Sequence, residues 1–142
     1  MWGKDCVVAP GIHAKKGVTI VTHNPNAEVV IGHGTILRGT SIGCVEKIAI
    51  GPQSLLDGAH LIDADLHPKD PTARLENHSV GPSDPITIGF GSYIGPHSVL
   101  MKGAAIGDHV QIMAGSCLGK KSVGNQATVR GSPASIHVPR PS

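Results

Sequence analysis

A period of six residues runs through the second half of this chain and constrains its fold more than any other feature. Between residues 88 and 122 a branched aliphatic residue opens every block of six, and a small or compact residue follows four places later. The openers are Ile88, Ile94, Leu100, Ile106, Ile112 and Leu118, and the followers are Ser92, Ser98, Ala104, Val110, Ser116 and Ser122. Such a period fits neither a 3.6-residue helix nor a two-residue alternation. It is typical of a solenoid in which each hexapeptide forms one short strand and a turn, and three of them complete a coil of about 18 residues. We therefore predict an all-β, parallel β-helix with the openers pointing inward.

The same pattern divides the chain into segments of a single domain. It begins at Ile31, slips by one residue at Ile42, and continues through Ile50, Leu56 and Ile62. Residues 67–85 carry four prolines and no ladder, so we expect a long loop there, with little or no helix. We predict an irregular cap or first coil at 1–28, coils at 29–66 and 86–123, and a tail at 124–142. Roughly six to seven coils fit the length.

Composition narrows the class of protein. Aromatic residues make up 2% of the chain and charged residues 15%, and there are 19 glycines. This argues against a coiled coil and against a core built on aromatic rings. The net charge is +2 without a long basic run, so we expect no nucleic-acid partner. The three cysteines form no CxxC pair, and no apolar stretch has the length of a signal peptide or a membrane span. A reduced, cytoplasmic protein is the expectation.

Four segments carry a family resemblance. They read DADLHPKDPTAR (63–74), PITIGFGSYIG (85–95), MKGAAIGDHVQIMAGSCLGKK (101–121) and GSPA (131–134). In this order they resemble the hexapeptide-repeat acyltransferases, which are left-handed parallel β-helix enzymes. The likeness is greatest to the branch that acetylates sugars, which includes maltose, galactoside, capsule and O-antigen acetyltransferases. The resemblance implies a homotrimer, acetyl-coenzyme A as cosubstrate bound between subunits, and His67 of the His-Pro pair as the catalytic base.

The chemistry of acyl transfer supports a histidine in that role. A hydroxyl that attacks a thioester must lose its proton, and imidazole titrates near neutral pH. Asp63 and Asp65 precede His67 by four and two residues, so an extended segment places all three side chains on one face. Either carboxylate could orient the ring or hold the acceptor, or both could be corner or solvent-facing residues. No metal is required.

The later repeats contain weaker sequence signals of a binding site for the acyl donor. Ala114 and Gly115 match the small pair along which the family's pantetheine runs, and Lys120 matches a position that could hold a phosphate. The resemblance also gives Tyr93 the place of an aromatic wall for the pantetheine arm. A solvated turn lysine is the alternative for Lys120.

Several positions depart from the family pattern. Pro96 replaces a small residue and supplies neither a hydroxyl nor a backbone N–H, so the oxyanion stabiliser stays unassigned. Ser135 stands where a cation is usual, and Arg130 or Arg140 could replace that phosphate contact.

Two other functions compete with sugar O-acetylation. A γ-class carbonic anhydrase-like enzyme has the same fold, but its zinc site needs two histidines five residues apart, and the partner of His33 is Arg38. A non-catalytic trimeric scaffold would bind no coenzyme A. The acceptor itself is not identified by the sequence.

Overall fold

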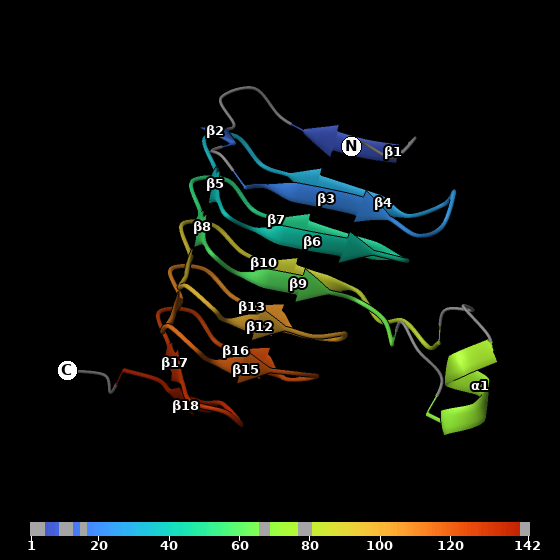
Figure 1. Ribbon diagram of the computed structural model, residues 1–142. Coiled ribbons are helices and arrows are strands. Elements are labelled where there is room, and N and C mark those ends of the chain that lie inside the picture. Colours follow the sequence, from blue (N-terminus) through green and yellow to red (C-terminus); the bar gives the residue numbers. More distant parts are fainter. Residues whose placement is uncertain (1–4, 9–12, 15–16, 66–68, 77–80, 140–142) are drawn as a thin grey trace.

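Three parallel sheets form a three-sided prism (Figure 1). The computed structural model describes residues 5–8, 13–14, 17–65, 69–76 and 81–139. Sheet A holds β1 (Asp5–Val8), β4 (Glu28–Ile31), β7 (Lys47–Ile50), β10 (Ile86–Ile88), β13 (Ala105–Ile106) and β16 (Ser122–Val123). Sheet B holds β2 (His13–Ala14), β5 (Ile36–Arg38), β8 (Leu55–Asp57), β11 (Tyr93–Ile94), β14 (Gln111–Ile112), β17 (Thr128–Arg130) and the antiparallel β18 (Ser135–His137). Sheet C holds β3 (Thr19–Thr22), β6 (Ser41–Cys44), β9 (His60–Ile62), β12 (Val99–Leu100) and β15 (Cys117–Leu118).

The chain visits sheets A, B and C in turn and so winds one coil after another. Five complete coils and the first two strands of a sixth lie in the described part of the chain. The predicted all-β solenoid is confirmed, but the expected six to seven coils are too many. The excursion after β9 and the antiparallel β18 take up residues without adding coils.

The openers of successive coils stack on one another inside the prism. In sheet A, Ile31 pairs with Ile50, Ile50 with Ile88, and Ile88 with Ile106, and each is at most 4% exposed. Fully burying one such side chain contributes about 1.5–3 kcal/mol. The column therefore holds neighbouring coils together as well as filling the core.

The small followers as far as Ser116 also point inward, and the serines in such positions join one coil to the next. The Ser54 hydroxyl donates to the Gly89 carbonyl at 3.1 Å, and the Ser92 hydroxyl donates to the Gly107 carbonyl at 2.9 Å. Each serine lies at a corner, where a larger side chain would find no room beside the openers. Each hydroxyl satisfies a part-buried carbonyl that lies outside the paired strands.

The strict count of six is wrong at two places. Leu61 pairs with Leu100 and is buried, whereas Ile62, the predicted opener, lies half-buried on the outside of β9. The spacing from Leu56 to Leu61 is five residues. The last repeat also shortens, so Val123 is buried and Ser122 is exposed.

The excursion leaves the prism between β9 and β10 and carries the helix α1 (Pro71–Glu76), which stands away from the stacked coils in Figure 1. Asp70 caps this helix, because its carboxylate accepts from the Ala73 amide at 2.9 Å, and Pro71 follows at the first helical position. With six residues, α1 is the one helix of the described chain and cannot cross a bilayer.

The corrected register predicts unequal costs for two adjacent truncations. Leu61→Ala opens a cavity in the core and should lower the free energy of unfolding by about 2–5 kcal/mol. Ile62→Ala removes a half-buried outer side chain and should cost clearly less. Urea unfolding followed by circular dichroism measures both, and a larger loss for Ile62→Ala would contradict the register.

Candidate functional site

The excursion is rooted at the edge where sheet C strands end and sheet A strands begin, here called the C–A edge. Its departing limb is residues 63–65 and its returning limb residues 81–84; together they are called the stem. The two limbs pair antiparallel at Ala64 and Ser83. The Asp65 amide donates to the Pro82 carbonyl at 3.1 Å, and the Asp65 carbonyl accepts from the Gly81 amide at 2.6 Å. The stem is thus an ordered extension of the prism.

Asp63 binds the stem to the coil above. Its side chain is fully buried, and its carboxylate accepts from the amides of Val45, Glu46 and Lys47 at 2.7–2.9 Å. These amides lie in the turn between β6 and β7, so one carboxylate satisfies the turn's donors. Of the two roles that the sequence leaves open for Asp63, these contacts favour the structural one.

The Cys44 thiol is buried against the same carboxylate. Its sulfur lies 3.7 Å from Asp63 Oδ2 and 3.4 Å from the Glu28 carbonyl oxygen. Burial, and then the charge of Asp63, raise the pKa of the Cys44 thiol from 9.0 to about 12. The thiol therefore stays protonated at neutral pH and donates to its neighbours.

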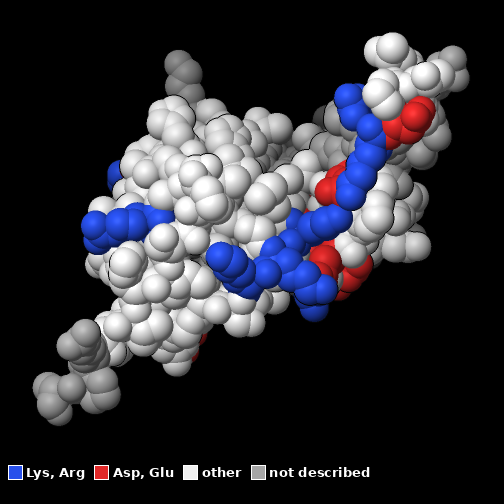
Figure 2. Space-filling model, turned by 90° about the horizontal axis from the view of Figure 1, so that it is seen from below, with Lys and Arg blue, Asp and Glu red and all other residues white. Residues whose placement is uncertain are grey.

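Two ion pairs bind the stem to the coils below. Lys102 Nζ lies 2.6 Å from Asp65 Oδ2, and Lys120 Nζ lies 3.6 Å from Asp84 Oδ2. Figure 2 shows Lys and Arg side chains strung across the lower face with Asp and Glu side chains beside them. Asp65 is therefore half-buried and paired with a lysine that the sequence analysis did not single out.

His67, the proposed base, lies outside the described residues, which end at Asp65 on the departing limb. Its role stays a prediction. Asp65, two residues earlier in the sequence, is held by backbone hydrogen bonds to the returning limb and by its ion pair with Lys102.

The predicted donor residues lie on one face and at two different edges of the prism. Tyr93 points outward from β11 in sheet B, since its neighbour Ile94 is buried, and the exposed Arg130 ends β17 in the same sheet. Ala114 and Gly115 are exposed in the corner between β14 and β15, here called the B–C edge. Lys120 lies instead on the C–A edge, after β15. One chain alone does not bring these residues into one groove.

The corner at residues 114–115 leaves room for a ligand to approach the main chain. Gly115 has φ +73°, and a Cβ built on it would meet nothing within 4 Å. Its amide donates to the carbonyl of Pro96 in the preceding coil at 2.9 Å. The corner is therefore held in place while its outer surface stays open.

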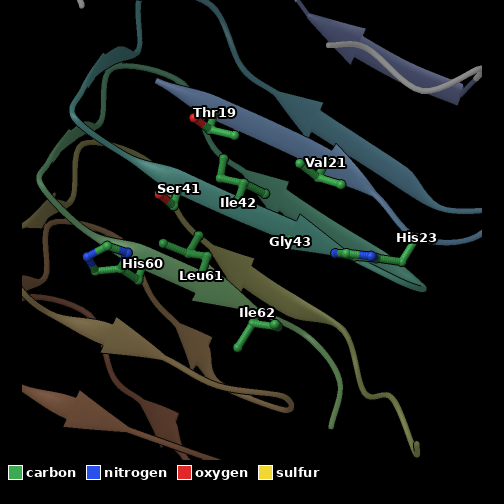
Figure 3. A pocket seen from close by; sticks show the side chains of 9 residues that line it. All are labelled: Thr19, Val21, His23, Ser41, Ile42, Gly43, His60, Leu61 and Ile62. Atoms are coloured by element: carbon green, nitrogen blue, oxygen red, sulfur yellow. The ribbon is translucent and has the colours of Figure 1, made fainter. Parts of the chain in front are cut away.

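A pocket of about 290 Å³, which the sequence analysis missed, lies on the outer face of sheet C in the first three coils (Figure 3). Its lining residues are Thr19, Val21, His23, Ser41, Ile42, Gly43, His60, Leu61 and Ile62. Figure 3 shows Thr19, Ser41 and His60 on three neighbouring strands, with His23 beside Gly43 at the other end. No Asp, Glu, Lys or Arg is among the lining residues, and none of them was predicted as a site residue. The alternation of outward residues around Ile42 and Leu61 is the signal that could have grouped them.

No three His, Cys, Asp or Glu side chains lie close enough together to hold a metal ion within the part of the chain that the structure describes. The carbonic anhydrase alternative gains no support from these residues.

The fold and its corners define the class: a parallel β-helix protein built from hexapeptide repeats, with one long excursion at an edge. Residues 85–120 match the family described as bacterial transferase hexapeptide (six repeats). This repeat and fold confirm the resemblance to the hexapeptide-repeat acyltransferases.

Solved structures share the fold at low sequence identity. A point mutant of AntD, an N-acyltransferase from Bacillus cereus, was solved with dTDP-4-amino-4,6-dideoxyglucose and coenzyme A; it aligns with a TM-score of 0.71 and 17% identity over 98% of this chain and 80% of its own. AntD solved with dTDP and 3-hydroxybutyryl-CoA aligns with a TM-score of 0.64 and 17% identity over 95% of this chain and 80% of its own. The product of the Bacillus cereus gene BC4754 aligns with a TM-score of 0.58 and 20% identity over 92% of this chain and 76% of its own. At these identities the likeness establishes the fold.

Replacing Asp63 with asparagine should destabilise the fold. Asp63→Asn keeps the shape but turns one acceptor into a donor that faces backbone amides, which should cost about 1–3 kcal/mol or more of unfolding free energy. Asp57→Asn, on the outer face of β8, is the matched control and should cost less than about 0.5 kcal/mol. Chemical unfolding measures both; equal stabilities would show that the turn does not depend on the carboxylate.

The raised pKa of Cys44 predicts how stability depends on pH. The unfolded thiol ionises near 9.0 and the folded one near 12. Its contribution is fully present below pH 9 and is lost as the pH rises towards 12. Cys44→Ala should therefore give a shallower fall in unfolding free energy over that window than the parent. Equal slopes in parent and Cys44→Ala would contradict the assignment.

Proposed function

We propose that this chain is an acyltransferase that moves an acetyl group from acetyl-coenzyme A to a hydroxyl of a sugar or glycan precursor. The observation that carries the proposal is the excursion. It interrupts an otherwise regular β-helix at the C–A edge, is held by an ordered stem, and carries the His-Pro pair two residues beyond Asp65. Support also comes from AntD, which shares the fold and was solved with coenzyme A and a sugar nucleotide.

His67 acts as the general base in this proposal. It takes the proton from the acceptor hydroxyl as the oxygen attacks the thioester carbonyl. A C–O bond forms, the C–S bond breaks, and the coenzyme leaves as a thiolate that takes up a proton. The attack is direct, without an acyl-enzyme and without a metal. Tyr93, Ala114, Gly115, Lys120 and Arg130 are the proposed donor contacts.

The separation of these residues supports a site between subunits. Tyr93, Ala114 and Gly115 lie on sheet B and the B–C edge, while the stem leaves from the C–A edge across the width of sheet C. A base and donor residues on different edges can meet when one copy supplies the base and its neighbour supplies the donor surface. A homotrimer satisfies this for all copies at once. The free thiols Cys44 and Cys117 are compatible with the reducing cytoplasm, where we expect the protein to act.

The proposal is tested by measuring coenzyme A release with acetyl-coenzyme A and a panel of sugars, nucleotide sugars and oligosaccharides. His67→Ala should lower kcat by about 10²–10⁴-fold, because general-base catalysis contributes that much. His137→Ala, an exposed histidine of β18, is the control and should stay within about twofold of the parent. Including amino sugars separates hydroxyl from amine acceptors.

Four outcomes would overturn parts of this proposal. A His67→Ala variant as active as the parent excludes the assigned base. Activity confined to amino sugars replaces O-acylation with N-acylation. No coenzyme A binding at millimolar concentration by calorimetry favours a non-catalytic scaffold, and a sedimentation mass of one chain contradicts the shared site.

A further inference from the structure

The shortest ion pair in the described part of the chain lies at the root of the excursion. Lys102 Nζ and Asp65 Oδ2 are 2.6 Å apart, and each side chain is 36% exposed. The other two pairs are longer and their lysines more open: Lys120 with Asp84 at 3.6 Å, where Lys120 is 82% exposed, and Lys47 with Glu28 at 4.0 Å. A charge-assisted hydrogen bond that is this short and partly buried fixes the positions of its two side chains more firmly than an ion pair open to solvent does.

Asp65 is held on its backbone as well as on its side chain. Its amide and carbonyl both bond to the returning limb, at Pro82 and Gly81. These bonds join the limbs to each other. The pair with Lys102 is different, because it ties the departing limb to the coil below.

Lys102 itself belongs to a well-anchored corner. It follows β12, and the next residue, Gly103, donates its amide to the Asp84 carbonyl at 3.1 Å. A Cβ on Gly103, whose φ is +81°, would lie 2.8 Å from Asp84 Oδ2 and 2.9 Å from Lys120 Cγ, so a larger residue there would displace these two side chains. The same corner therefore holds the returning limb by its backbone and the departing limb by Lys102.

We propose that Lys102 is a positioning residue for the proposed reaction: its ion pair with Asp65 fixes the departing limb of the stem, which ends two residues before His67 in the sequence. The inference rests on the proposed function, since it assigns no chemistry to Lys102. In this inference Lys102 acts through the stem and not on the donor or the acceptor. A displacement of a catalytic group by about 1 Å can cost on the order of a hundredfold in rate, so the ion pair has consequences for kcat.

The kinetic test compares Lys102→Met, Lys102→Arg and, as a matched control, Lys121→Met. Lys121 is an exposed lysine of the same edge, one coil further, and forms none of the ion pairs found among the described residues. Lys102→Met should lower kcat about tenfold and leave the KM for acetyl-coenzyme A within about twofold. Lys102→Arg should recover most of kcat, and Lys121→Met should match the parent.

A double-mutant cycle tests whether Lys102 acts through Asp65. If it does, Asp65→Asn combined with Lys102→Met should lower kcat no further than Asp65→Asn alone. Additive losses would overturn the inference. So would a Lys102→Met variant whose donor KM rises at unchanged kcat, because Lys102 would then be a donor contact.

Hydrogen exchange separates failure of this inference from failure of the proposed function, because it needs no activity. The amides of Asp65, Gly81 and Asp84 bond within the stem. They should exchange faster in Lys102→Met than in the parent and at the parent's rate in Lys121→Met, with the core amides of β12 unchanged in both. If the protein transfers no acyl group but the stem still loosens, the proposed function fails and the positioning of the stem by Lys102 stands. Unchanged stem exchange in Lys102→Met overturns that positioning whatever the activity.

Discussion

The stacking of aliphatic side chains from coil to coil is the interaction on which the rest of this structure depends. A single coil, such as the one that buries Ile86, Ile88, Ile94 and Leu100, cannot bury its inward side chains alone, so each coil becomes stable only against its neighbours. The column Ile31–Ile50–Ile88–Ile106 shows this, because its parallel register aligns residues far apart in sequence. Low aromatic content follows from it, since a narrow prism has room for aliphatic openers and small corner residues but hardly for rings.

The same stacking explains how the fold tolerates a long excursion. Ile50 and Ile88 pair as if the segment between β9 and β10 were absent, so the interruption costs the core little. The cost of closing a longer loop grows only slowly with its length. Polar contacts then order the stem: Asp63 bonds to the turn above, and Lys102 and Lys120 reach up from the turns below. Apolar contacts hold the prism together, whereas charged contacts hold the stem of the loop that leaves it.

The faces and edges of the prism divide the surface by chemistry. Charged residues gather at the C–A edge around the stem, where Asp65, Asp84, Lys102 and Lys120 pair. The pocket on sheet C, by contrast, is lined by apolar, hydroxyl and imidazole groups. Because a flat strand presents alternate residues to the outside, each sheet displays one set of outward side chains in register. We propose shared sites because the proposed base and most of the proposed donor residues lie at different edges of one copy.

The sequence by itself determined the architecture, because a period of six can be satisfied by a repeating strand and turn and by little else. It also marked the excursion, since a break stands out against a regular ladder. It misjudged Ile62, because counting by six cannot see a coil one residue short; only the pairing of Leu61 with Leu100 reveals it. It left a catalytic and a structural role open for Asp63, and the hydrogen bonds from the turn above to its carboxylate favour the structural role. The pairing of Lys102 with Asp65 was decided by tertiary structure alone, because the coils that bring the two charges within 2.6 Å are separated in sequence by the whole excursion.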